Sequence, residues 1–105
     1  MRKVEFLIDL GNTDRYRHNH FSEGKKIIAF SLQYETFTQG KWLPVVRYDS
    51  AHGFAHRDLF DLNGIQSKTL LNINELNEAL TFAESDLKSS WKIYKERFLG
   101  EYDEE

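Results

Sequence analysis

The stretch from residue 47 to residue 58 holds most of the side chains in this sequence that could do chemistry. Within twelve residues it carries two histidines, two arginines, two aspartates and a tyrosine, bent back on itself at His52-Gly53. Histidine exchanges a proton close to neutral pH, and arginine stabilises negative charge on phosphorus. These groups suffice for metal-independent cleavage of a phosphodiester. The candidate catalytic residues are His56, His52, Arg47, Asp49, Tyr48 and Arg57.

Each of these residues has a role in a catalytic interpretation. His56 and His52 act as acid and base, and Tyr48 is an alternative donor of a proton to the leaving oxygen. Arg47 and Arg57 hold phosphate, and Asp49 orients a neighbouring histidine or arginine. A structural interpretation stands beside it, because arginine and aspartate on adjacent strands form ordinary cross-strand ion pairs and His52-Gly53 suits a turn. Spacing alone leaves both interpretations open.

A second, weaker candidate is the pair His18 and His20. Residues at i and i+2 of a strand share one face, as do metal-binding histidines on the strands of cupin-like barrels. Glu23 follows closely, and His52 or His56 could supply a third ligand. Because a cupin barrel needs a longer chain than this one, we expect no metal and no other cofactor.

The composition limits the classes of function. The chain of 105 residues fits one domain, and its net charge of −3 provides no general attraction for nucleic acid. The absence of cysteine excludes thiol nucleophiles and Cys-ligated zinc, and it favours a reducing compartment. No glycine-rich loop precedes a helix in the way that nucleotide phosphates require.

Glycine-containing turns separate segments of alternating polarity, which predicts strands joined by hairpins. Pro44 lies inside the fourth segment and cannot donate to a sheet ladder, so it indicates an edge, a bulge or a strand start. The expected strands cover residues 4–10, 15–21, 28–35, 41–49 and 54–60.

The rest of the chain predicts one long helix. It is expected to begin near Asn72 or Asn74, where Asn72 and Glu75 have the spacing of a capping box, and to end at Gly100. An acidic tail over 101–105 is expected to fray. The helix carries a single apolar stripe formed by Leu76, Ala79, Leu80, Ala83, Leu87, Trp91, Tyr94 and Phe98.

These elements predict one α+β domain over residues 1–100, an antiparallel meander of about five strands with the C-terminal helix packed on one face. The opposite face has no second helix to cover it. We expect that face to be solvated, paired in a homodimer or used for binding.

Residues 45–58, together with Gln33-Tyr34-Glu35 and Asn77-Glu78-Ala79-Leu80, resemble a family of small bacterial and archaeal proteins without an assigned function. More distantly, the order of parts resembles the TumE-type toxins of prokaryotic toxin–antitoxin pairs. That resemblance implies RNA as substrate and a cognate antitoxin as partner. It rests on Tyr48, Asp49, His52, Gly53 and His56.

Two functional hypotheses follow. The favoured one is a non-enzymatic interaction module that uses the uncovered sheet face or an edge strand for a protein partner or for self-association. The alternative is a metal-independent ribonuclease toxin. The sequence contains no signal peptide and no run of about 18 apolar residues, so we expect a cytoplasmic protein that makes no use of a membrane.

Overall fold

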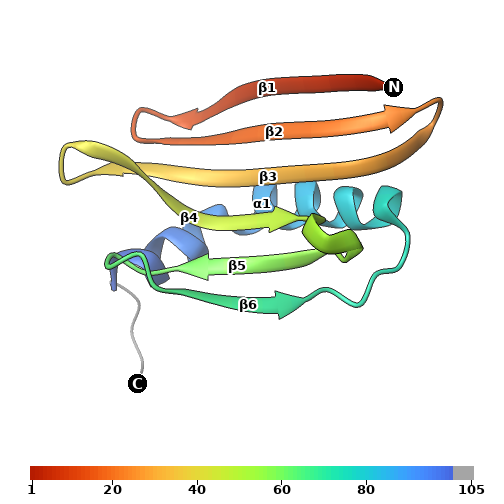
Figure 1. Ribbon diagram of the computed structural model, residues 1–105. Coiled ribbons are helices and arrows are strands. Elements are labelled where there is room, and N and C mark those ends of the chain that lie inside the picture. Colours follow the sequence, from red (N-terminus) through yellow and green to blue (C-terminus); the bar gives the residue numbers. More distant parts are fainter. Residues whose placement is uncertain (101–105) are drawn as a thin grey trace.

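The computed structural model describes residues 1–100, with the exception of the side chain of His52. Six strands form one antiparallel sheet in which spatial order follows chain order (Figure 1). A single helix follows the strands and lies across one face of the sheet. The elements are β1 (Arg2–Gly11), β2 (Asp14–Glu23), β3 (Lys26–Thr38), β4 (Lys41–Asp49), β5 (His56–Phe60), β6 (Gln66–Leu70) and α1 (Leu76–Leu99).

The predicted fold class, an α+β meander with one helix on one face, is confirmed. The sheet has one strand more than the five expected, because β6 occupies a segment expected to be a loop. All five residues of β6 are exposed, so no apolar alternation marks it in the sequence. Its backbone nevertheless pairs with β5, from His56 opposite Leu70 to Phe60 opposite Gln66.

The capping box predicted at Asn72 does not form, whereas the predicted end of the helix is confirmed. Asn72 has a φ of 58°, in the left-handed region, and α1 begins only at Leu76. Glu75 occupies the N-cap position without a side-chain capping hydrogen bond. Gly100 ends the helix with a φ of 72°, and its N–H donates to the Arg97 carbonyl. The tail predicted to fray, 101–105, lies outside the described residues.

The irregularity expected at Pro44 is a β-bulge. Tyr34 pairs with Val46 and Glu35 pairs with Pro44, so Val45 is an extra residue on β4. A bulge accommodates a residue without an N–H, because the ladder is already interrupted there.

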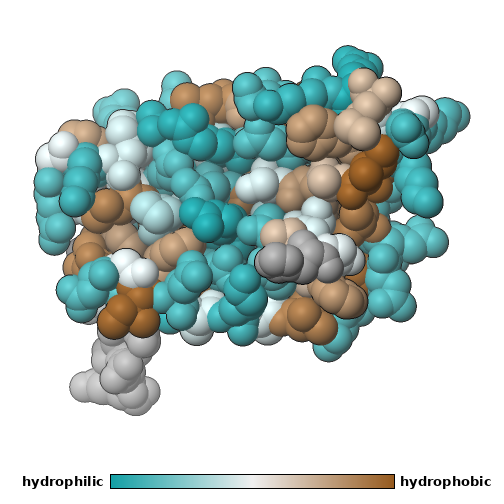
Figure 2. Space-filling model, viewed as in Figure 1, coloured by the Kyte–Doolittle hydropathy of each residue, from teal (hydrophilic) through white to brown (hydrophobic). Residues whose placement is uncertain are grey.

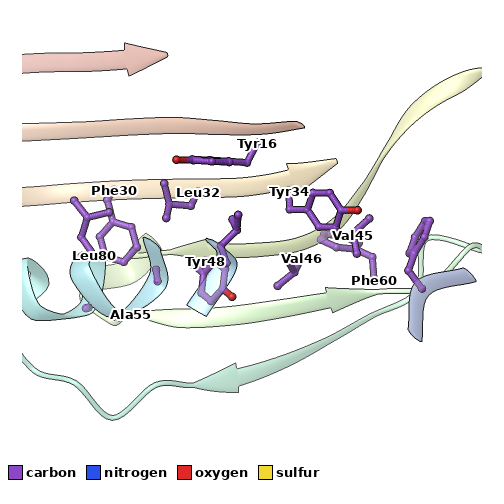
Figure 3. Packing of buried hydrophobic residues seen from close by; sticks show 14 residues of the cluster. Tyr16, Phe30, Leu32, Tyr34, Val45, Val46, Tyr48, Ala55, Phe60 and Leu80 are labelled. Atoms are coloured by element: carbon purple, nitrogen blue, oxygen red, sulfur yellow. The ribbon is translucent and has the colours of Figure 1, made fainter. Parts of the chain in front are cut away.

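The apolar core lies between α1 and the sheet. The helix packs mainly over β3 and β4, and its predicted stripe supplies the buried side chains. Tyrosine, leucine and valine side chains from the central strands meet it, as Figure 3 shows. Within the described residues no helix is both long and apolar enough to cross a bilayer. The buried core comprises Tyr16, Phe30, Leu32, Tyr34, Val45, Val46, Tyr48, Ala55, Phe60, Ala79, Leu80, Ala83, Leu87 and Phe98.

Alternation along the strands gives the sheet two faces of different character. We call the face under α1 the helix face and the other the open face. Leu32 and Tyr48, paired across β3 and β4, lie on the helix face, whereas their neighbours Gln33 and Arg47 lie on the open face. Figure 2 looks onto the open face, and hydrophilic side chains dominate its centre.

The packing of α1 predicts a large effect of truncating its stripe. Leu87 is fully buried, so we expect Leu87→Ala to lower the free energy of unfolding by about 2–5 kcal/mol. Ile93, on the same helix, is 66% exposed, and Ile93→Ala should change it by less than about 0.5 kcal/mol. Urea unfolding followed by far-UV circular dichroism measures both values. Equal effects of the two substitutions would contradict the position of α1.

Candidate functional site

The pairing of β4 with β5 distributes the candidate catalytic residues over both faces of the sheet. Successive residues along a strand project from opposite faces of the sheet. The six candidate catalytic residues therefore do not form one site. Arg47, Asp49 and His56 lie on the open face, whereas Tyr48 and Arg57 lie on the helix face. His52 belongs to the turn Ala51–Gly53, and its side chain is not described. The cross-strand pairs are Arg47 with Asp58, Tyr48 with Arg57, and Asp49 with His56.

His56 is the centre of a buried group on the open face. Its Nε2 lies 2.7 Å from Asp49 Oδ1 and 4.0 Å from Asp58 Oδ2. Its Nδ1 lies 3.1 Å from the carbonyl oxygen of Phe54. His56 is 3% exposed and Asp58 is 2% exposed. Lys68 on β6 lies beside them, with Nζ 3.3 Å from His56 Nε2 and 3.8 Å from Asp58 Oδ1.

A second polar group on the open face surrounds Glu35 on β3. Arg15, Arg17 and Gln33 donate hydrogen bonds of 2.7, 3.0 and 2.6 Å to its carboxylate. Arg47 in turn donates to the Gln33 side-chain oxygen over 2.7 Å. Burial alone would raise the pKa of Glu35, but the three hydrogen bonds outweigh burial and lower that pKa. Arg47 therefore belongs to a structural network, although its cross-strand partner on β5 is Asp58 of the His56 group.

Aromatic side chains help to bury these charges on a face that no helix covers. The guanidinium of Arg15 lies 3.9 Å from the ring centroid of Trp42, and that of Arg47 lies 5.1 Å from the ring centroid of Phe60. Both distances fall in the range of cation–π contacts. Beside Asp49, a shallow hollow of about 320 Å³ lies on the open face, with Phe21 and Ala29 in its lining.

Tyr48 and Arg57 belong to a different group, which ties the sheet to α1. Tyr48 donates a 2.5 Å hydrogen bond to Asp86, and Tyr94 donates to the same carboxylate. Arg57 donates to the Tyr94 hydroxyl over 3.0 Å. Burial, together with the hydrogen bond to Asp86, raises the pKa of Tyr48 far above its usual range. Tyr48 therefore holds its proton, and the geometry gives it and Arg57 a structural role.

His18 and His20 lie on the helix face of β2. His18 Nε2 is 2.7 Å from His20 Nδ1, and the His18 ring stacks on Phe6 with 4.3 Å between ring centroids. His56 projects from the opposite face, so it does not supply a third ligand to this pair. In the part of the chain that the structure describes, the one group of three metal-ligating side chains is Asp49, His56 and Asp58.

The structure also reveals polar residues that the sequence reasoning did not select. Asp14 is buried and accepts hydrogen bonds from Tyr34, Thr36 and Lys95. Like Glu35 and Asp86, Asp14 accepts hydrogen bonds from side chains in distant parts of the chain. The only signal was positional, since Asp86 directly precedes Leu87 of the apolar stripe. Nothing in the sequence marks Asp14 or Glu35 as buried.

Comparison with known proteins identifies a family but no activity. Residues 1–104 match the model of a domain of unknown function, DUF7718. The chain belongs to the DUF7718 family. No curated protein and no solved structure matches the chain. The family match assigns no catalytic residues to this DUF7718 domain. The resemblance to TumE-type toxins stays a prediction.

The environment of His18 in this DUF7718 domain predicts a pH dependence of stability. Burial lowers the pKa of His18, reinforced by His20 and Lys88 and opposed by Glu84. The unfolded chain therefore binds a proton more readily than the folded chain does. His18 is neutral in both states above its ordinary pKa of about 6.5, and stability is lost as the pH falls from there towards the lowered, folded pKa.

We expect the free energy of unfolding to fall less between neutral and mildly acidic pH in His18→Gln than in wild type. Urea titrations across that pH range measure the difference. His20→Gln is the control. Its free energy of unfolding should still fall almost as much as that of wild type over this pH range, because His18 remains buried. A His18→Gln profile parallel to that of wild type would contradict this assignment.

Proposed function

We propose that this domain is a non-enzymatic interaction module that self-associates by antiparallel pairing of the β1 edge with β1 of a second copy. The observation that carries the proposal is the nature of this edge. β1 is ten residues long and lies at the margin of the sheet. Phe6, Leu7 and Ile8 at its centre are 40%, 46% and 38% exposed. Long, apolar, unprotected edges favour pairing with another strand.

The contrast with the other edge supports this choice. β6 has five residues, QSKTL, and carries Lys68 near its middle. Short edge strands with a lysine are a common protection against edge-to-edge association. β1 has twice that length and an apolar centre, so it is the edge suited to a partner.

The position of α1 also supports pairing at β1. The helix packs mainly over β3 and β4, so it does not cover the helix face of β1. Phe6 and Ile8 lie on that face, as the stacking of Phe6 on His18 indicates. In a two-fold dimer whose axis is perpendicular to the sheet, these side chains meet their equivalents and lose exposed apolar area.

Among the registers centred on Glu5, Phe6 and Leu7, charge complementarity favours one. With Phe6 opposite Phe6 of the second copy, Lys3 lies opposite Asp9 and Val4 lies opposite Ile8. Centring the pairing on Glu5 instead would place two glutamates opposite each other. Centring it on Leu7 would oppose Glu5 and Asp9. Like charges directly opposite destabilise a strand pair, so the Phe6-centred register is favoured.

We expect the wild-type chain to form a dimer and Phe6→Lys to weaken it by at least about tenfold in Kd, because two lysines then meet on the two-fold axis. Sedimentation equilibrium measures Kd. Phe82 on α1 is also 40% exposed, and Phe82→Lys is the matched control that should leave Kd unchanged. A wild-type chain that stays monomeric at high concentration would refute the proposal.

A charge reversal tests the register itself. Lys3→Glu places two like-charged pairs in the dimer and should weaken it about tenfold, since each pair changes by roughly 0.5–1 kcal/mol. The double variant Lys3→Glu/Asp9→Lys should restore the wild-type Kd. Dimerisation that resists Lys3→Glu would place the contact on a different surface.

The alternative, a metal-independent ribonuclease toxin, draws support from the contact between His56 and Asp49, which orients an imidazole as acid–base catalysis requires. Other features oppose it. His56 is 3% exposed, and Arg57, assigned to phosphate, projects from the other face. The carboxylates of Asp49 and Asp58 also repel a phosphate at this position. An antitoxin partner belongs to this alternative, whereas a cytoplasmic location is expected for either function.

We therefore expect the purified chain to leave RNA intact, and wild type and His56→Ala to have the same lack of effect on bacterial growth when expressed equally. Gel analysis of RNA incubated with each protein provides the measurement. Cleavage or growth arrest by wild type, lost in a folded His56→Ala variant, would replace the interaction module by the ribonuclease.

A further inference from the structure

Three side chains with metal-binding atoms converge on the open face where β4 meets β5. Asp49 and His56 are cross-strand partners, and Asp58 lies two residues beyond His56 on the same face of β5. One ligand atom from each lies within 4.8 Å of the others. Since His56 and Asp58 are almost fully buried, this arrangement does not belong to a solvated acidic surface.

The orientation of His56 is the first sign of a cation. A carbonyl oxygen only accepts hydrogen bonds, so the Phe54 carbonyl assigns the proton of this contact to Nδ1. Nε2 then points at Asp49 and Asp58, both of which are acceptors when ionised. Nε2 and the two carboxylates therefore face one another, and the exposed Lys68, with Nζ 3.3 Å from Nε2, is the cation beside them. Histidines that bind metals commonly have the other ring nitrogen anchored on a carbonyl in this way.

Asp58 supplies an independent observation. Its Oδ1 is buried and has no hydrogen-bond partner among the described residues. The nearest cation, Lys68 Nζ, is 3.8 Å away on a side chain that is 51% exposed. A buried carboxylate oxygen without a partner costs free energy, and a directly bound cation removes that cost.

We propose that Asp49, His56 and Asp58 form a binding site for one divalent first-row transition metal ion of the Zn²⁺ or Mn²⁺ type. One imidazole nitrogen and carboxylate oxygens suit these ions. Ca²⁺ prefers a site made of oxygen alone, and Cu⁺ prefers sulfur. The ion takes the place between His56 and Asp49, and Lys68 moves aside towards solvent.

The site joins β4 to β5 and leaves further coordination positions to water or to a ligand. The shallow hollow beside Asp49 gives such a ligand room on the open face. The site lies where β4 meets β5, and β2 and β3 separate it from β1. Metal binding and pairing of β1 are therefore independent.

The test is a titration of the untagged, chelator-treated and dialysed full chain with ZnCl₂, and separately with MnCl₂, by isothermal calorimetry. We expect saturation at one ion per chain. Asp58→Asn keeps the size of the side chain, and it should weaken binding at least about tenfold. His20→Gln is the control and should bind as wild type does, because His18 and His20 lie on the other face.

A second readout covers the case in which a variant folds poorly. The bound ion should raise the Tm of the wild-type chain and of His20→Gln, and should raise that of Asp58→Asn much less. Saturable binding that survives both Asp58→Asn and His56→Gln would overturn the proposal. So would loss of binding in His20→Gln, or a wild-type chain that binds neither ion.

Discussion

The whole structure depends on α1 burying its single apolar stripe against one face of the sheet. Each fully buried leucine or phenylalanine contributes about 1.5–3 kcal/mol, and the helix brings Leu80, Leu87 and Phe98 to the interface beside two buried alanines. Because strand residues alternate between faces, covering one face assigns the other to solvent. The separation of Tyr48 and Arg57 from Asp49 and His56 is a direct consequence, since these neighbours along the strand cannot share a face.

No helix within residues 1–100 covers the open face, and its charged side chains are stabilised by pairing with one another. Glu35 is almost completely buried, yet two arginines and a glutamine hydrogen-bond to its carboxylate. Removing both arginines would leave an uncompensated buried charge, which is far more costly than the ion pairs are stabilising. The same reasoning separates the two open-face groups. Glu35 accepts hydrogen bonds from two arginines, whereas Asp58 has Lys68 at 3.8 Å and one oxygen without a hydrogen-bond partner.

The β1 edge and the part of the open face where β4 meets β5 therefore suit different functions. β1 lies beyond the helix and keeps apolar side chains exposed, which suits pairing with a second copy. The Asp49, His56 and Asp58 group lies on the opposite half of the sheet, where β4 and β5 pair. The contacts of His56 suit a bound cation, because its Nε2 faces the carboxylates of both Asp49 and Asp58.

The sequence by itself determined the fold class, the period of the strands, the stripe on α1, the stop at Gly100 and an irregularity at Pro44, because these depend on local rules of spacing and backbone geometry. It also indicated that residues 47–58 bend back on themselves, and that His56 and Asp58 share a face. It could not reveal β6, whose exposed residues have no pattern and which forms only because β5 offers a partner. Nor could it reveal three sets of contacts. Asp86 meets Tyr48, Lys68 meets His56, and Glu35 is linked through Gln33 to Arg47. Those contacts join positions far apart in the chain, and only the register of the strands and the placement of α1 decide which side chains meet.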